Sequence, residues 1–182
     1  ITGPAIARGT SFLKDRLGDQ LFAADIEIVD DPHRKRGLRS KPFDAEGIAN
    51  SKRSIVKDGV LTTWLLDLAS AKQLGLETTG HAGRGTSGPP SPGPSNLYLT
   101  PGTLSPAELM ADIEAGLYIT SLMGMGVNGV TGDYSRGASG FWIENGEITF
   151  PVTELTIAGN LNQMFAGMSR ADDLAFRFGT NS

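Results

Sequence analysis

The stretch that decides the local fold is residues 140–152, Gly-Phe-Trp-Ile-Glu-Asn-Gly-Glu-Ile-Thr-Phe-Pro-Val, with Asn145-Gly146 at its centre. A two-residue type I′ turn needs positive φ at both central residues, and Asn-Gly adopts this conformation readily. β-branched and aromatic residues lie on both sides of the pair, as expected of strands. We therefore predict a hairpin that pairs Gly140–Glu144 with Glu147–Val152.

A second hairpin follows from the same chemistry, because Asp58-Gly59 separates Arg53–Lys57 from Val60–Leu65. Each hairpin is followed by a helix-like stretch. These stretches are Asp67–Leu74, which ends before Gly75, and Asn160–Met168, which follows Gly159. The order strand, turn, strand, helix thus occurs twice, which suggests an internal ββα duplication.

The remaining elements are shorter or less regular. Helical spacing predicts a helix over Gly3–Leu21, and Ser105-Pro106-Ala107-Glu108 is a capping box that opens a helix over Pro106–Ala115. We predict strands at Ala24–Val29, Asn96–Leu99 and Leu117–Leu122, a basic connection at Pro32–Gly47, and an exposed loop without regular structure at Gly83–Pro94. The fold class is α+β, with a mainly antiparallel sheet that could take a barrel-like form and a few short helices.

Composition limits the classes of function. The chain has 182 residues, 24 of them glycine, nearly twice the usual ~7%, and a formal net charge of −4. The acidic balance argues against a nucleic-acid partner, and no apolar stretch is long enough to predict a membrane span. The one basic run, His33-Arg34-Lys35-Arg36 with Arg39 and Lys41, is either a solvated loop or a docking patch for an acidic partner.

Metal-binding and catalytic patterns are missing from the sequence. There is no cysteine, and neither His33 nor His81 belongs to a metal-binding motif. We therefore predict no catalytic residue, no metal ligand and no cofactor in this chain. His81 is interpreted as a structural, hydrogen-bonding histidine or as a substrate contact. A hydrolase that pairs Asp133 with His81 is the weakest of the hypotheses.

The glycine-rich stretch Gly124–Glu147 holds the candidate binding residues. It interleaves glycines with polar side chains and has few apolar ones, so we do not expect an ordinary core strand. Its glycines allow the backbone to come close to a ligand or to another strand. Either the stretch is a tight, self-satisfied loop or a bulged crossover, or it contacts a peptide or another subunit. Asp133 and Arg136 could form a local ion pair. The candidate contact residues are His81, Asn128, Asp133, Tyr134, Ser135 and Arg136.

The same region carries a family resemblance. Val130–Ala138, Gly140–Ile148 and Pro151–Leu161 resemble the C-terminal signature of the PmbA/TldE branch of the TldD/PmbA family, once called modulators of DNA gyrase. Supporting segments occur in the same order along the chain: Pro42–Gly47, Lys57–Leu61, Trp64–Leu66, Leu74–Leu76 and Thr79–Gly83.

The resemblance implies a cytoplasmic complex of TldD-like and TldE-like subunits, a zinc metallopeptidase that acts on unfolded or leader peptides. In that family the TldD subunit holds the zinc, through a histidine–glutamate helix motif and a cysteine, and this chain has neither. Residues 1–182 would then form a single non-catalytic C-terminal domain, without the family's N-terminal domain. Its partners would be a TldD-like subunit in a heterodimer, or a second copy in a homodimer, and a peptide substrate. The alternative is a regulatory protein-interaction domain, related to gyrase or an antitoxin, without a proteolytic role.

Overall fold

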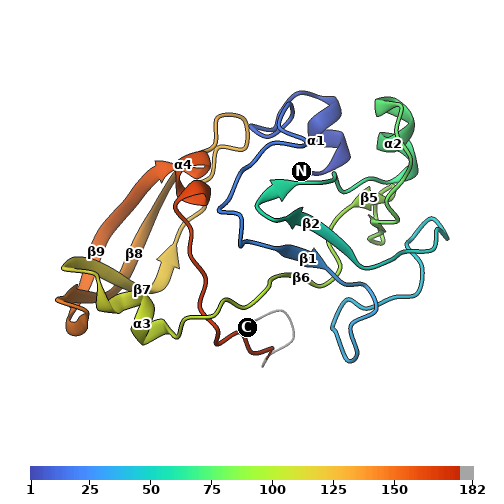
Figure 1. Cartoon of the computed structure of the whole chain (residues 1–182). Helices are drawn as coiled ribbons and strands as arrows, with labels where there is room; N and C mark the ends of the chain where they lie inside the picture. The colour runs from blue at the N-terminus through green and yellow to red at the C-terminus, as the bar shows by residue number, and fades with distance from the viewer. Residues whose placement is uncertain (177–182) are drawn as a thin grey trace. The chain divides into compact units, whose positions relative to one another are not determined.

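The computed structural model describes residues 1–176 (Figure 1). The chain divides into two compact units. Among the described residues, the first comprises Ile1–Thr100 with Ala175 and Phe176, and the second comprises Pro101–Leu174.

The first unit is built on a four-stranded antiparallel sheet with the order β3-β2-β1-β6. Its strands are β1 (Ile28–Asp30), β2 (Arg53–Lys57), β3 (Val60–Leu61) and β6 (Leu97–Leu99). The turn between β2 and β3 has Asp58 at φ 52° and Gly59 at φ 77°, which confirms the predicted hairpin. The Gly59 amide donates to the Ile26 carbonyl at 2.9 Å, and a Cβ on Gly59 would collide with the Phe22 carbonyl oxygen. Only glycine fits this position.

The core of the first unit collects apolar side chains from the sheet and from the segments that flank it. These side chains are 7% exposed or less: Leu13, Leu21, Phe22, Ile26, Val29, Ile55, Val56, Leu61, Trp64, Leu65 and Leu66. Burying each aliphatic side chain contributes about 1.5–3 kcal/mol, so this cluster dominates the stability of the unit. Helix α2 (Leu68–Leu74) begins at its N-cap Asp67 and ends at Gly75, which is left-handed at φ 69°. Both ends are where the sequence predicts them.

Two predictions at the start of the chain are wrong. Helix α1 covers only Gly3–Ala7, because Gly9 turns to φ 68° and the Gly18 amide pairs with the Leu61 carbonyl instead of continuing a helix. The strand predicted at Ala24–Val29 begins only at Ile28. The chain before it is a turn, in which the Ile26 amide donates to the Ala23 carbonyl at 3.0 Å.

The sequence predictions for the two long loops of this unit are met to different degrees. The connection Pro32–Gly47 contains no helix or named strand, as predicted. The segment Gly83–Pro94 is not wholly irregular, because β4 (Ala82–Gly83) pairs with β5 (Ser91–Pro92) at its base. Antiparallel pairing needs backbone groups only, so the small residues at the base of this loop still form a short ladder.

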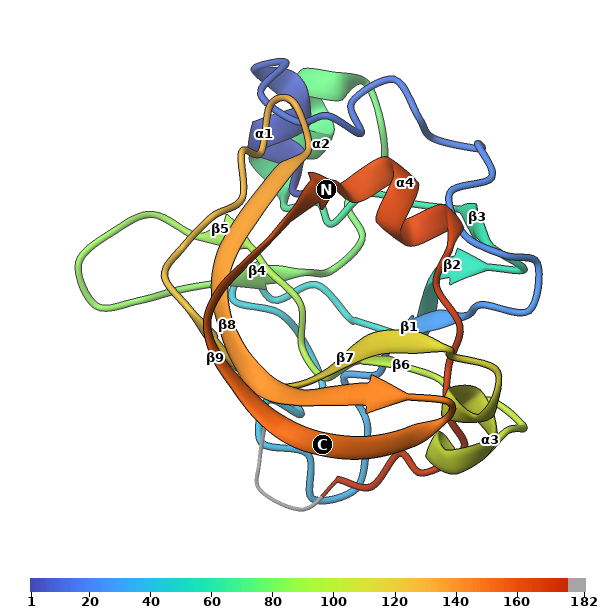
Figure 2. The same ribbon diagram turned by 90° about the vertical axis from the view of Figure 1, so that its left-hand side faces the viewer.

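The second unit is built on the three-stranded antiparallel sheet β7-β8-β9. The strands are β7 (Ala115–Met123), β8 (Asp133–Glu144) and β9 (Glu147–Asn160), and β8 and β9 run side by side as long, strongly curved ribbons (Figure 2). Asn145 at φ 49° and Gly146 at φ 84° form the turn between them, and the Gly146 amide donates to the Ile113 carbonyl at 2.9 Å. The predicted hairpin is confirmed, and it is longer than the sequence suggests.

The glycine-rich stretch contains β8, the central strand of this sheet, and three of its twelve residues, Ala138, Gly140 and Ile143, are buried. Its close approach to another strand is one of the two roles that the sequence predicts for its glycines. Ala138 is fully buried in β8, and a Cβ on Gly140 would collide with the Tyr118 carbonyl oxygen of the neighbouring strand. The small side chains allow β7 and β8 to approach closely.

The helices of the second unit are short and capped. Helix α3 (Pro106–Ala111) has the predicted capping box between Ser105 and Glu108. It ends before Ala115 because the next residues turn to accept the amides of the β8–β9 turn. Helix α4 (Leu161–Ala166) begins at its N-cap Asn160, as predicted.

The architecture is α+β with antiparallel sheets and short helices, as predicted. In residues 1–176 the three sheets are open, with two different strands at the ends of each, so the barrel-like closure is not found. Both hairpins are followed by a helix, α2 and α4, while the duplication itself stays a prediction. Among the described helices, none has the length and apolar character needed to cross a membrane.

Candidate functional site

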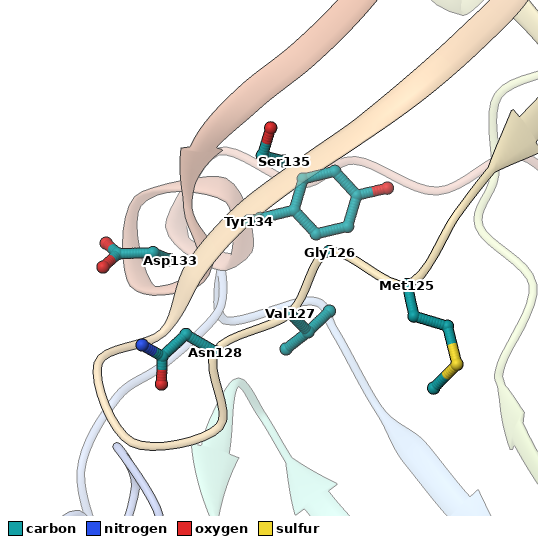
Figure 3. Close-up of a pocket in the computed structure, with 7 residues that line it drawn as sticks. All are labelled: Met125, Gly126, Val127, Asn128, Asp133, Tyr134 and Ser135. Atoms are coloured by element: carbon teal, nitrogen blue, oxygen red, sulfur yellow. The ribbon is translucent and has the colours of Figure 1, made fainter.

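An open depression of about 360 Å³ lies in the second unit, where the chain returns from β7 into β8. Its lining residues are Met125, Gly126, Val127, Asn128, Asp133, Tyr134 and Ser135 (Figure 3). The Ser135 amide donates to the Gly126 carbonyl at 2.7 Å, and Val127 forms an isolated bridge with Tyr134. A Cβ on Gly126 would collide with the Ser135 carbonyl oxygen, so this approach of two backbones requires glycine.

Asn128 organises the turn that closes one end of the depression. Its side-chain Oδ1 accepts from the Val130 amide at 3.0 Å. Its backbone carbonyl accepts from the Gly132 amide at 2.9 Å, and its backbone amide donates to the Asp133 carbonyl at 2.8 Å. An asparagine side chain that bonds the backbone two residues ahead is a common way to fix a tight turn. The first role of Asn128 is therefore to hold the loop.

Asp133 is also held by local hydrogen bonds. Thr131 Oγ1 donates to its Oδ2 at 2.6 Å and Asn160 Nδ2 to its Oδ1 at 3.2 Å. The bond from Thr131 and then that from Asn160 lower the pKa of Asp133 below its ordinary value. The predicted ion pair with Arg136 is wrong, because residues three apart in a strand project to opposite faces. Arg136 Nη2 instead donates to the Leu122 carbonyl at 3.4 Å.

Tyr134 and Ser135 are the residues left available for contact. No hydrogen bond within residues 1–176 engages either hydroxyl group. Figure 3 shows the Tyr134 ring over Gly126 on the Met125 side, while the Asp133 carboxylate points the other way. The structure therefore brings together Asn128, Asp133, Tyr134 and Ser135, whereas Arg136 does not line the depression.

His81 belongs to the first unit, in a buried polar cluster. It is 5% exposed, its Nδ1 lies 2.7 Å from Thr79 Oγ1, and its Nε2 lies 3.1 Å from Asp30 Oδ2. The Ser95 hydroxyl donates to the same Asp30 oxygen at 2.7 Å, so the serine faces the carboxylate and not the imidazole, unlike a Ser-His-Asp triad. This geometry favours the structural interpretation of His81.

Asp30 is the residue of this cluster that sequence reasoning missed. It is 1% exposed and also accepts the Ser95 amide at 2.9 Å. Burial would raise the pKa of Asp30, but the hydrogen bonds from His81 and Ser95 outweigh it and hold the pKa below its ordinary value. The one signal for Asp30 in the sequence is its position directly after the apolar strand residues Ile28 and Val29.

The donor groups do not fit a zinc site. In the part of the chain that the structure describes, residues 1–176, no group of three or more histidine, cysteine, aspartate or glutamate side chains could hold a metal ion. His81 has both ring nitrogens engaged, and His33 Nε2 lies 2.8 Å from Asn50 Oδ1. The chain has no cysteine.

Strand β7, which leads to the depression, is an unusual edge. Its nine residues, AGLYITSLM, include no charge and no proline, and β8 is the one strand that pairs with it within the described residues. Its side chains Leu117, Tyr118, Leu122 and Met123 are all more than a third exposed. Edge strands are usually protected by charge or proline, as β9 is by Glu147, Pro151 and Glu154. β7 lacks this protection.

The open antiparallel sheets and the short capped helices define a mixed α+β architecture in two compact units, and the second unit has an open depression lined by backbone, polar and apolar groups. The chain belongs to the PmbA/TldA metallopeptidase C-terminal domain family, whose model matches residues 1–182. The resemblance seen in the sequence is thereby confirmed.

Similar proteins include two metalloproteases of the PmbA type. Metalloprotease PmbA of Escherichia coli O157:H7 is 47% identical over 165 residues, which cover 91% of this chain and 35% of that protein. A PmbA homologue of Haemophilus influenzae is 46% identical over 179 residues, 97% of this chain and 38% of that protein.

Solved structures share the fold. A candidate modulator of a DNA gyrase from Thermotoga maritima has a TM-score of 0.81 at 37% identity, covering 91% of this chain and 38% of that one. TldE from Thermococcus kodakarensis has a TM-score of 0.84 at 26% identity, covering 93% of this chain and 39% of that one. The chain thus spans little more than a third of the length of these proteins.

Proposed function

We propose that this chain is a non-catalytic domain of a PmbA/TldE-type subunit, which assembles with a TldD-like subunit into a cytoplasmic zinc metallopeptidase complex acting on unfolded or leader peptides. The proposal rests on one observation: the side chains of this chain that the structure describes do not provide the zinc ligands that a metallopeptidase needs. The family is a metallopeptidase family, yet the chain has no cysteine, and its two histidines are engaged with Asn50 and with Asp30 and Thr79. We therefore expect the zinc to be held outside residues 1–176, and we assign it to the partner subunit.

The geometry of the second unit supports a contact with an extended peptide. An unprotected strand edge presents backbone donors and acceptors in a regular row, and an extended peptide can pair with such a row whatever its side chains are. The uncharged edge of β7 leads directly into the depression lined by Gly126 and Tyr134. Sequence-independent pairing suits a complex that handles unfolded or leader peptides.

The residues of the depression take separate roles in this proposal. Asn128 and Asp133 hold the turn in place, and Arg136 supports the strand through the Leu122 carbonyl. The Tyr134 hydroxyl, whose ring lies over Gly126, is the group that would bond to a peptide main chain, and Ser135 holds the approach of the two backbones through its amide. None of these side chains is assigned a proton-transfer step.

The first test is reconstitution. The full-length subunit that contains this chain is mixed with a TldD-like partner, and bound zinc and cleavage of an unfolded peptide are measured with and without a chelator. We expect zinc in the complex and chelator-sensitive cleavage that needs both subunits. Zinc or turnover in this subunit alone would refute the proposal, and stable binding without turnover would support the regulatory alternative. The mass of the complex distinguishes a heterodimer from a homodimer.

The second test addresses the site itself. Tyr134→Phe removes one hydroxyl and keeps the ring, and Tyr98→Phe in the first unit is the matched control. A hydrogen bond contributes about 0.5–1.5 kcal/mol, so we expect Tyr134→Phe to raise KM about two- to tenfold with kcat little changed. An unchanged KM would exclude the Tyr134 hydroxyl from substrate contact.

A further inference from the structure

The connection between β1 and β2 contains a concentrated positive charge. We define residues 31–43 as the basic loop (Figure 1). After Asp31 it contains no acidic residue, and its cations are Arg34, Lys35, Arg36, Arg39 and Lys41. The chain as a whole carries a net charge of −4, so this loop opposes the overall sign of the protein. A local reversal of charge is the kind of field that selects a partner of opposite sign.

Three of these cations are available to a partner. Arg34 lies over the Phe176 ring, 3.4 Å from its centroid, and Lys41 Nζ donates to the Ala82 carbonyl at 2.9 Å. The other three cations, Lys35, Arg36 and Arg39, are exposed, and no salt bridge engages them within residues 1–176.

Two large apolar side chains are exposed among these cations. Leu38 is 69% exposed and Phe43 is 58% exposed. A loop that was only solvent-exposed and charged would have no need of an exposed leucine and phenylalanine next to its cations. The combination is typical of a surface that contacts another protein, where apolar side chains supply contact area and charge supplies selectivity.

The loop is ordered by hydrogen bonds to Asn96 and by hydrogen bonds within the loop. Asn96 Nδ2 donates to the Asp31 carbonyl at 2.7 Å, and Asn96 Oδ1 accepts from the Arg39 amide at 3.2 Å. Ser40 Oγ donates to the Arg34 carbonyl at 2.6 Å. Compact loops that are fixed in this way are often functional. A partner that docks here loses less free energy to ordering the loop than it would on a flexible tail.

We infer that the basic loop is a docking surface for an acidic protein segment that also carries apolar side chains. Charge complementarity selects the carboxylates, and Leu38 and Phe43 select the apolar groups. A nucleic acid is the less favoured occupant. Three available cations and a net negative charge provide little of the phosphate neutralisation on which such binding depends. This inference does not rest on the proposed peptidase role.

The test uses the full-length protein that contains this chain. The probe is a fluorescein-labelled synthetic peptide that combines glutamates with leucines, followed by fluorescence anisotropy. The comparison probes are the same peptide with glutamine in place of glutamate, and a double-stranded DNA oligonucleotide. We expect binding of the acidic peptide that weakens as salt is added, and weaker binding of both comparison probes.

Two sets of charge reversals test whether the acidic peptide binds at the basic loop. The triple variant Lys35→Glu, Arg36→Glu and Arg39→Glu is expected to weaken binding of the acidic peptide by about tenfold or more. The matched control is Lys52→Glu, Lys57→Glu and Lys72→Glu, at three exposed lysines of the same unit outside the loop, and it has the same net charge. It should retain binding.

Four results would overturn the inference: no binding of the acidic peptide, tighter binding of the DNA, equal binding of the glutamine peptide, or equal losses in both triple variants. If the triple variant fails to fold, Leu38→Ser and Phe43→Ser provide the second test. These substitutions keep every charge and should still weaken binding of the acidic peptide, and unchanged binding would count against the inference.

Discussion

Replacing Asp30 with asparagine tests how far one buried carboxylate stabilises the first unit. Asp30 accepts hydrogen bonds from the Ser95 amide, from the Ser95 hydroxyl at 2.7 Å, and from His81 Nε2 at 3.1 Å. Asparagine has nearly the same shape, and its oxygen can still accept the amide. Its NH₂ group, however, faces two groups that donate to the carboxylate in the native protein.

The expected cost follows from the two lost charge-assisted bonds. Each hydrogen bond to a charged group contributes about 1.5–3 kcal/mol, and rotation of the Ser95 hydroxyl recovers part of the loss. We therefore expect Asp30→Asn to lower the free energy of unfolding by about 2–4 kcal/mol at neutral pH. This is a large share of the 5–15 kcal/mol that holds a typical domain folded.

The effect should depend on pH in a defined direction. The pKa of Asp30 is lowered in the folded state, so folding favours the carboxylate over the neutral acid. The stabilisation is fully present above the unfolded pKa of about 3.9, and it is lost as the pH falls through the folded value. The difference between the native protein and Asp30→Asn should therefore be full at pH 7 and shrink below about pH 4.

Urea unfolding of residues 1–182 measures this difference. Trp64, which is 5% exposed in the same unit, reports the transition, and Trp142→Phe in both proteins removes the signal of the second unit. Asp15→Asn is the control, because the Asp15 side chain is 83% exposed and should cost less than about 0.5 kcal/mol. A loss below about 1 kcal/mol for Asp30→Asn at pH 7, or an equal loss at pH 3, would refute the reasoning.

Three further substitutions test the turn, the depression and a helix cap. Gly59→Ala places a side chain at φ 77° against the Phe22 carbonyl, so thermal unfolding should show a loss of more than about 1 kcal/mol, and a stable protein would contradict the turn geometry. Gly126→Ala pushes against the Ser135 carbonyl. It should lower peptide turnover by the reconstituted complex, and full activity would show that this backbone approach is dispensable. Ser105→Ala removes the cap of α3 and should cost about 1 kcal/mol in urea unfolding, whereas no change would mean that the cap is already lost to fraying.

The features that could be predicted from the sequence are those set by neighbouring residues. Asp58-Gly59 and Asn145-Gly146 adopt positive φ by their own chemistry, so both hairpins follow from four residues. The capping box that begins at Ser105 is local in the same sense. In each case the interaction that fixes the backbone spans only a few positions, and it is visible in the printed sequence.

The features that were missed depend on distant partners. Helical spacing over Gly3–Leu21 could not reveal that Gly18 pairs with Leu61. The glycines of β8 predict a close approach of the backbone to a ligand or a strand, and only the structure identifies the neighbour of Gly140 as the Tyr118 carbonyl. Asp30 was missed because its partners His81 and Ser95 lie 51 and 65 positions away.

The candidate site was predicted in part. The sequence grouped Asn128, Asp133, Tyr134 and Ser135, and all four line one depression, because a short loop and the start of a strand bring near neighbours together. Their assignment as contact residues stays a prediction. Arg136 does not line the depression with them, and its guanidinium donates to the Leu122 carbonyl at 3.4 Å instead.

The two hairpin turns also bear on how the protein ages. Asn-Gly and Asp-Gly bonds are the peptide links most prone to succinimide formation, in which the amide nitrogen of the glycine attacks the preceding side-chain carbonyl carbon. In this protein both nitrogens are already committed, that of Gly59 to the Ile26 carbonyl and that of Gly146 to the Ile113 carbonyl, each at 2.9 Å. The folded chain thus shields these two turn links from deamidation and isomerisation. Isoaspartate should accumulate at them only in molecules whose turns have opened.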